Sequence, residues 1–161
     1  MLKVNSTCIA DMSGMDEFIK QALRLSNKEA AVGFDSAIHE DSGLAYAGLA
    51  KILNDGADDV NIPPRLFMES TNDLFEYDNN KQINLTVRRI LYKGFPTEEE
   101  LLKLANKEKT IMQQVMKLKL FDYPNNKPST IAIKGRDDAL IDTKELFNNI
   151  RTEVGKFSEG N

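Results

Sequence analysis

Residues 61–68 read Asn-Ile-Pro-Pro-Arg-Leu-Phe-Met, and this stretch separates the secondary-structure elements predicted before it from those predicted after it. Two consecutive prolines fix φ and remove two backbone donors, so the segment cannot lie inside a helix or a central strand. Each proline also favours an extended conformation in the residue before it. The stretch therefore predicts a stiff, extended arm that carries the guanidinium of Arg65 and the ring of Phe67. A rigid arm loses little entropy on docking, which suits a subunit interface.

Two questions about this arm stay open at the level of sequence. Short Pro-rich turns are common, and in an ordinary turn Phe67 would fill the core of its own chain. Arg65 either fixes the arm against a neighbouring carboxylate or is a surface arginine with no fixed partner.

Before the arm, the sequence predicts two strands and two helices. Alternating apolar residues predict an opening strand over residues 2–10, and helical spacing follows from Met15 to Ser26. The short apolar run from Ala30 to Phe34 predicts a second strand. Residues 44–53 are small and apolar and predict a helix that ends at Asn54-Asp55-Gly56.

After the arm, the sequence predicts mainly helix. Residues 72–92 carry a helical stripe, Gly94-Phe95-Pro96 breaks the chain, and Thr97 with Glu100 forms a capping-box pattern. A long apolar face then predicts a helix from Thr97 to about residue 119.

The last forty residues predict a long connection, a short helix and a closing strand. The connection at 120–141 is extended and polar, and we expect it to be mobile in the free protein and ordered on assembly. Asp142 or Thr143 would cap a helix containing Leu146, and residues 151–157 alternate as a strand does. The whole pattern predicts a single α+β domain over residues 1–161, with a small mixed or antiparallel sheet, several helices and long extended loops.

Composition narrows the classes of function. The net charge of −4 implies no general attraction to nucleic acid or to an anionic membrane. One cysteine and one histidine, Cys8 and His39, cannot supply a zinc site, and no apolar run is long enough to span a membrane. His39 precedes Glu40 and Asp41, so a general base is conceivable, but a solvated loop histidine is the simpler interpretation. We therefore expect no catalytic residue, no metal and no cofactor.

Two further stretches lie far downstream of the arm. Residues 127–135 read Lys-Pro-Ser-Thr-Ile-Ala-Ile-Lys-Gly, and residues 139–143 read Ala-Leu-Ile-Asp-Thr. With the arm, they resemble the phage virion-morphogenesis and tail-completion (neck) family, which is related to the minor tail protein Z group. Members typically show IPPRPF, then PST-I-x-x-KG, then PLIDTG-x-L-x-x-SI, in this order. The resemblance covers roughly residues 30–155.

The chain departs from the family pattern in the arm and in the last motif. Leu66 stands where the family has the proline between arginine and phenylalanine, Lys144 stands at the glycine after Asp-Thr, and Asn149 stands at the serine before isoleucine. The resemblance therefore implies no role at residue 144 that needs the backbone freedom of glycine.

The resemblance implies a structural virion protein, not an enzyme, at the phage head–tail junction or tail end. It implies a homo-oligomeric ring that completes the tail or joins it to the head, built after synthesis in the host cytoplasm. The partners would be other copies, the tail tube and the head-connector proteins, with DNA passing through the ring without specific binding and with no membrane. The residues expected at the subunit interface are Ile62, Pro63, Pro64, Arg65, Phe67, Asp142 and Thr143.

Three alternatives remain. The closest is a tail-terminator ring that caps the tail tube. The second is a small hydrolase that uses His39 with nearby acids, and the third is an intracellular interaction adaptor outside any virion. At Asp142 the alternative to an interface role is a plain helix N-cap.

Overall fold

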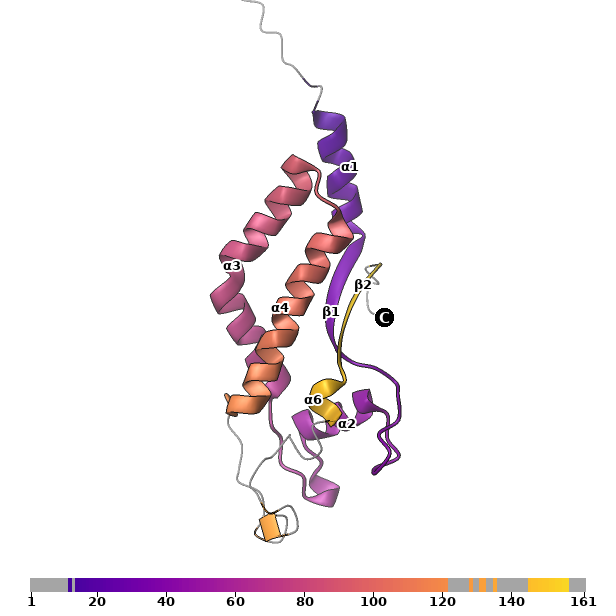
Figure 1. Cartoon of the computed structure of the whole chain (residues 1–161), viewed down its shortest axis with the longest axis vertical. Helices are drawn as coiled ribbons and strands as arrows, with labels where there is room; N and C mark the ends of the chain where they lie inside the picture. Colours follow the sequence, from indigo (N-terminus) through magenta and orange to yellow (C-terminus); the bar gives the residue numbers. More distant parts are fainter. Residues whose placement is uncertain are drawn as a thin grey trace, which may run out of the picture.

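The computed structural model describes residues 12, 14–121, 128, 131–132, 135 and 145–156. Within these residues the chain forms helices and one two-stranded antiparallel sheet, so the predicted α+β class is confirmed (Figure 1). The elements are α1 (Met15–Ser26), β1 (Lys28–Phe34), α2 (Tyr46–Asp55), a short 3-10 helix η1 (Asp58–Val60), α3 (Phe67–Lys93), α4 (Thr97–Leu118), α6 (Glu145–Asn148) and β2 (Ile150–Lys156).

A hairpin of two long helices, α3 and α4, forms the body of the molecule. Gly94 ends α3 in the left-handed region, with φ of +66°, which glycine adopts without steric cost. Phe95 and Pro96 then lead into α4, whose first turn carries three glutamates that suit the positive end of the helix dipole. The helix predicted over 72–92 is longer at both ends, since α3 runs from Phe67 to Lys93.

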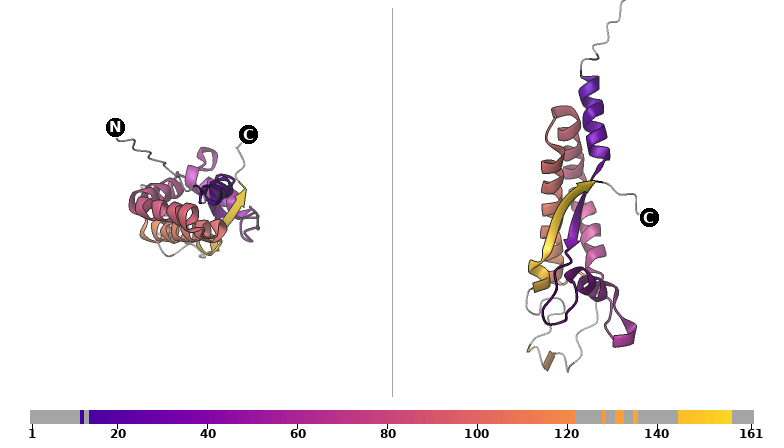
Figure 2. Two further views of the ribbon diagram at one scale, coloured as in Figure 1. Left: turned by 90° about the horizontal axis from the view of Figure 1, so that it is seen from above. Right: turned by 90° about the vertical axis from the view of Figure 1, so that its right-hand side faces the viewer.

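The sheet pairs a strand near the beginning of the described chain with a strand at its end. β1 and β2 pair antiparallel, from Lys28 opposite Lys156 to Phe34 opposite Ile150. Both strands lie along the helical hairpin and pack on α4 (Figure 2). Both strands were predicted from their short apolar or alternating runs, although β1 begins two residues earlier than expected. The opening strand predicted over 2–10 lies outside the described residues.

The main hydrophobic core lies at the end of the hairpin where α2 and α6 meet it. Phe67 and Val115 are fully buried there, as is Ile150 at the start of β2. The ring of Phe67 meets the ring of Phe34 edge-on, with centroids 6.3 Å apart. The remaining buried members are Tyr46, Ala50, Met112, Met116, Phe121 and Leu146.

α1 lies beside the opposite end of the hairpin and projects past it (Figure 1). Phe18 packs on Tyr92 of α3, with ring centroids 5.4 Å apart. Met15, Ile19 and Leu23 recur at helical spacing but are largely exposed, so this stripe is only partly covered by its own chain.

The capping box predicted at Thr97 and Glu100 is wrong. Pro96 occupies the N-cap position of α4, and no side chain caps the helix there. Glu100 is buried and instead bonds Lys103 and Arg89. These two cations come from α4 itself and from α3, and the second could not be read from local sequence. Within the described residues, no helix is long and apolar enough to cross a membrane.

Candidate subunit interface

The arm begins from a small closed loop that follows α2. Ala57 and Ile62 exchange backbone hydrogen bonds of 2.8 and 2.9 Å, which close the loop around η1. Asn61 completes the reversal in the left-handed region, with φ of +56°, a conformation that asparagine tolerates better than most residues. The arm therefore leaves a fixed turn and not a free linker.

Gly56 holds the arm close to the end of α2. Its φ is +80°, and a Cβ atom there would lie 2.7 Å from the backbone nitrogen of Pro64 and 2.9 Å from the carbonyl oxygen of Ile62. Only glycine satisfies both the backbone conformation and this close approach. Gly56 was predicted only as a helix terminator, and its contact with the arm is a new finding.

Asn54 fastens the second half of the arm to α2. Its carbonyl oxygen accepts the backbone N–H of Arg65 at 2.8 Å, and its side-chain oxygen accepts the N–H of Met68 at 3.0 Å. Its amide nitrogen donates to Glu69 at 3.1 Å and to Asp55 at 2.9 Å. Asn54 is buried, so these bonds are protected from water and hold the arm in one conformation.

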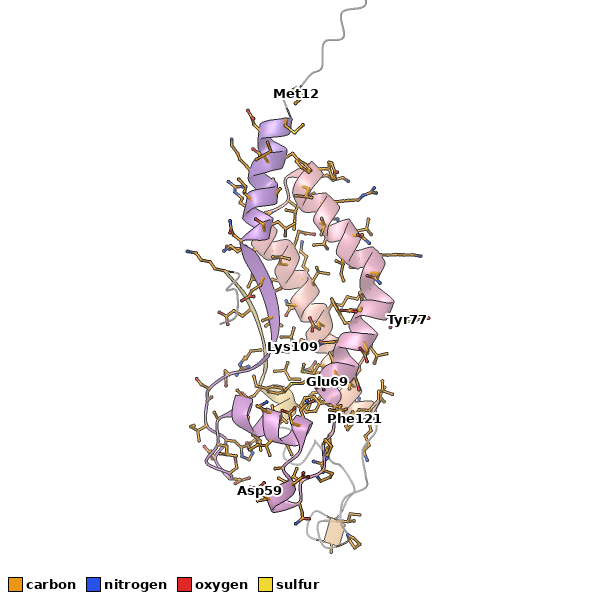
Figure 3. All side chains as sticks on the ribbon, turned by 180° about the vertical axis from the view of Figure 1, so that it is seen from behind. Met12, Asp59, Glu69, Tyr77, Lys109 and Phe121 are labelled. Atoms are coloured by element: carbon orange, nitrogen blue, oxygen red, sulfur yellow. The ribbon has the colours of Figure 1, made fainter. Side chains whose placement is uncertain are left out.

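The arm turns only some of its side chains outward. Pro64 is exposed, Leu66 is 47 % exposed, and Val60 at the end of η1 is 60 % exposed. Ile62 and Pro63 are half-buried. Figure 3 shows Asp59 at the far end of the molecule from Met12. The sequence predicted a stiff arm that presents Arg65 and Phe67, whereas the exposed side chains are those of Val60, Pro64 and Leu66, of which only Pro64 was predicted.

Two of the predicted interface side chains point into the chain itself. Phe67 is 0 % exposed and belongs to the core, as the alternative interpretation of the arm expected. The prediction that residues 61–68 are all extended is wrong, because α3 begins at Phe67. Arg65 is 7 % exposed, so it is not a surface arginine. Asp142 and Thr143 lie outside the described residues, and so does most of the 120–141 connection.

His39 lies in a separate polar cluster. Its Nε2 atom is 3.3 Å from the Glu145 carboxylate, and its Nδ1 atom is 2.9 Å from the Ser42 hydroxyl. The hydroxyl of Tyr46 donates to the same Glu145 oxygen at 3.1 Å. Burial and this bond to Glu145 raise the pKa of Tyr46 above its ordinary value. The carboxylate beside His39 thus comes from α6 and not from the adjacent Glu40 or Asp41.

The His39 cluster has a structural explanation. Leu44 and Gly43 close the loop through backbone bonds with His39 of 2.8 and 2.9 Å, and the Ser42 N–H donates to Nδ1 at 3.2 Å. The imidazole therefore joins a local turn to α6. His39 is half-buried, so the expectation of a solvated loop histidine is not met. Within the described ranges, no group of three or more acidic, histidine or cysteine side chains could hold a metal ion.

Comparisons of this chain with protein-family models, with curated proteins and with solved structures find no match.

Proposed function

We propose that this protein is a structural component of a phage virion, located at the head–tail junction or at the end of the tail. It assembles there as a ring of identical copies that completes the tail or joins it to the head. The observation that carries the proposal is the ordered set of three motifs, at residues 61–68, 127–135 and 139–143.

The local geometry of the first motif supports an interface role. A closed ring needs heterologous contacts, in which one patch meets a different patch on its neighbour. The arm is held by Asn54 and Gly56 and presents Val60, Pro64 and Leu66 to solvent. Because its conformation is already fixed, little further ordering is needed when a neighbour docks.

The tail-terminator ring remains the nearest alternative, because it uses the same kind of closed assembly. The hydrolase alternative is favoured by one observation, the contact of Ser42 and Glu145 with His39. The turn at residues 39–44, which holds the imidazole of His39 in place, explains that contact without a reaction. We therefore propose no enzymatic activity and no cofactor.

The proposal is tested by growing the phage that encodes this chain and analysing purified particles by quantitative mass spectrometry. We expect a small fixed number of copies per particle, retained in isolated tails or head–tail connectors. Absence of the chain from purified particles would refute a virion role. Tails without heads, produced by a deletion strain, would favour joining, whereas tails of irregular length would favour the terminator alternative.

A further inference from the structure

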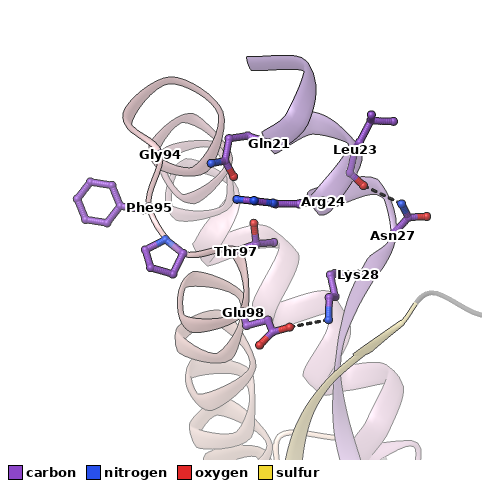
Figure 4. Close-up of a pocket in the computed structure, with 10 residues that line it drawn as sticks. Gln21, Leu23, Arg24, Asn27, Lys28, Gly94, Phe95, Thr97 and Glu98 are labelled. Carbon is purple, nitrogen blue, oxygen red and sulfur yellow. Dashed lines mark hydrogen bonds and ion pairs between the residues drawn. The ribbon is translucent and has the colours of Figure 1, made fainter. Parts of the chain in front are cut away.

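A pocket lies between the last turn of α1, the turn that joins α3 to α4, and the first turn of α4 (Figure 4). Its volume is about 650 Å³, which is within the range of small-ligand sites. It is at the opposite end of the helical hairpin from η1 and the arm (Figure 1). Exposed Leu23 and Phe95, at 59 % and 41 %, lie at its rim.

Two features of this pocket favour a negatively charged group. The N-terminus of α4 opens into it without a side-chain cap, so its backbone N–H groups carry partial positive charge. Arg24 extends across it beside Thr97, and within the described residues no carboxylate pairs with Arg24 (Figure 4). The other charges of the pocket balance each other, since Lys28 bonds Glu98 at 2.6 Å.

Thr97 gives a further, independent sign that this pocket binds a ligand. It is 8 % exposed, and its hydroxyl is buried with no hydrogen-bond partner in the part of the chain that the structure describes. In Figure 4 this hydroxyl points toward the side chain of Arg24. A buried hydroxyl without a partner is costly, and an acceptor that reached it would remove that cost.

The opposite end of the folded molecule carries carboxylates that match this pocket. Asp58 and Asp59 are exposed on η1, next to exposed Val60, and neither pairs with a described cation. By contrast, Asp55 nearby is already bonded to Lys51 at 2.7 Å. The loop that carries η1 is closed by the Ala57–Ile62 bridge, so both carboxylates project from a rigid tip.

We infer that the Arg24–Thr97 pocket of one copy receives the Asp58–Asp59–Val60 tip of the next copy. The carboxylates would meet Arg24, Thr97 and the N-terminus of α4, and Val60 would pack against the apolar rim. The two surfaces are different and lie at opposite ends of the folded molecule. The contact is therefore heterologous and can propagate into a ring or a filament. This inference rests on the proposed ring function and names the surfaces that meet.

Charge exchange tests the inference. Arg24→Glu should disable only the pocket, and Asp58→Lys with Asp59→Lys should disable only the tip. By sedimentation velocity, we expect the full-length parent to self-associate and each variant alone to associate at least tenfold more weakly. Mixing the two variants should restore part of the association, and so should combining all three substitutions in one chain. The charge at position 24 is then again opposite to that of the tip, while the N-terminus of α4 still favours an anion.

Thr97→Val separates the contact from folding. The variant keeps the shape of the side chain but removes the hydroxyl, so thermal unfolding should occur at the same or a higher temperature while association weakens two- to tenfold. Lys20→Glu, at an exposed cation on the same helix as Arg24 but outside the pocket, is the matched charge control and should associate as the parent does.

The outcomes distinguish this inference from the proposed function. A ring that persists in the Arg24→Glu variant overturns the pocket contact and leaves the ring. A parent chain that stays monomeric at every concentration also overturns the contact, and the virion role is then judged on particle composition alone. If the variants self-associate normally but fail to enter particles, the pocket binds another virion protein and the assignment to a second copy is wrong.

Discussion

Replacing Phe67 by alanine tests whether the arm is anchored by its own core or by a neighbouring subunit. The ring is 0 % exposed and meets Phe34 edge-on at 6.3 Å. Removal of a buried phenylalanine costs about 3–5 kcal/mol of folding free energy, of which about 0.5–1.5 kcal/mol belongs to an aromatic pair. We therefore expect Phe67→Ala to lower the free energy of unfolding by about 3–5 kcal/mol in urea denaturation followed by circular dichroism.

Leu66→Ala is the matched control, because Leu66 is the preceding residue and is 47 % exposed. We expect a change of about 0.5 kcal/mol in the free energy of unfolding, with a clear loss of association measured by light scattering. Phe67→Ala should associate normally at temperatures at which it is still folded. The reasoning is refuted if Phe67→Ala unfolds as the parent does but fails to associate, because Phe67 would then be an interface residue.

Three further substitutions have defined expectations. Gly56→Ala should destabilise the chain by about 1–3 kcal/mol in urea denaturation, because its Cβ would meet Pro64 at 2.7 Å with φ at +80°; parent-like stability would contradict the close approach. Hydrogen bonding from Lys103 holds the pKa of Glu100 below its ordinary value of 4.5, so the contribution of Glu100 to stability is present above pH 4.5 and is lost as the pH falls through the lowered pKa. Glu100→Gln should flatten this part of the stability–pH curve, and an unchanged slope would refute the assignment. His39→Ala should give particles that assemble and infect normally; loss of infectivity with intact particles would support the enzymatic alternative.

The parts of the fold that sequence could predict are those set by local periodicity. The apolar face of residues 97–118 defines α4, and the short runs at 30–34 and 151–157 define two strands. Residues 78–80 are poor helix formers, yet α3 continues through them, and Asn79 is buried there at 1 % exposure. Tertiary packing thus overrides a weak local propensity.

The candidate interface was harder to predict, because its shape depends on contacts between distant residues. Proline identified the arm, but which side chains face outward depends on where α3 begins, and that boundary is set by Asn54 at the end of α2. The Tyr46–Glu145 bond joins residues 99 positions apart, which no local pattern reveals. The Arg24–Thr97 pocket likewise combines two helices that are remote in sequence.

Cryo-electron microscopy of the intact virion, focused on the neck and the tail end, tests the central claim most directly. The account predicts a closed ring of this chain around the tail axis, with the residue 57–66 loop and arm of each copy against its neighbour. A map in which every protein of the neck and tail end is identified, and none is this chain, would contradict it.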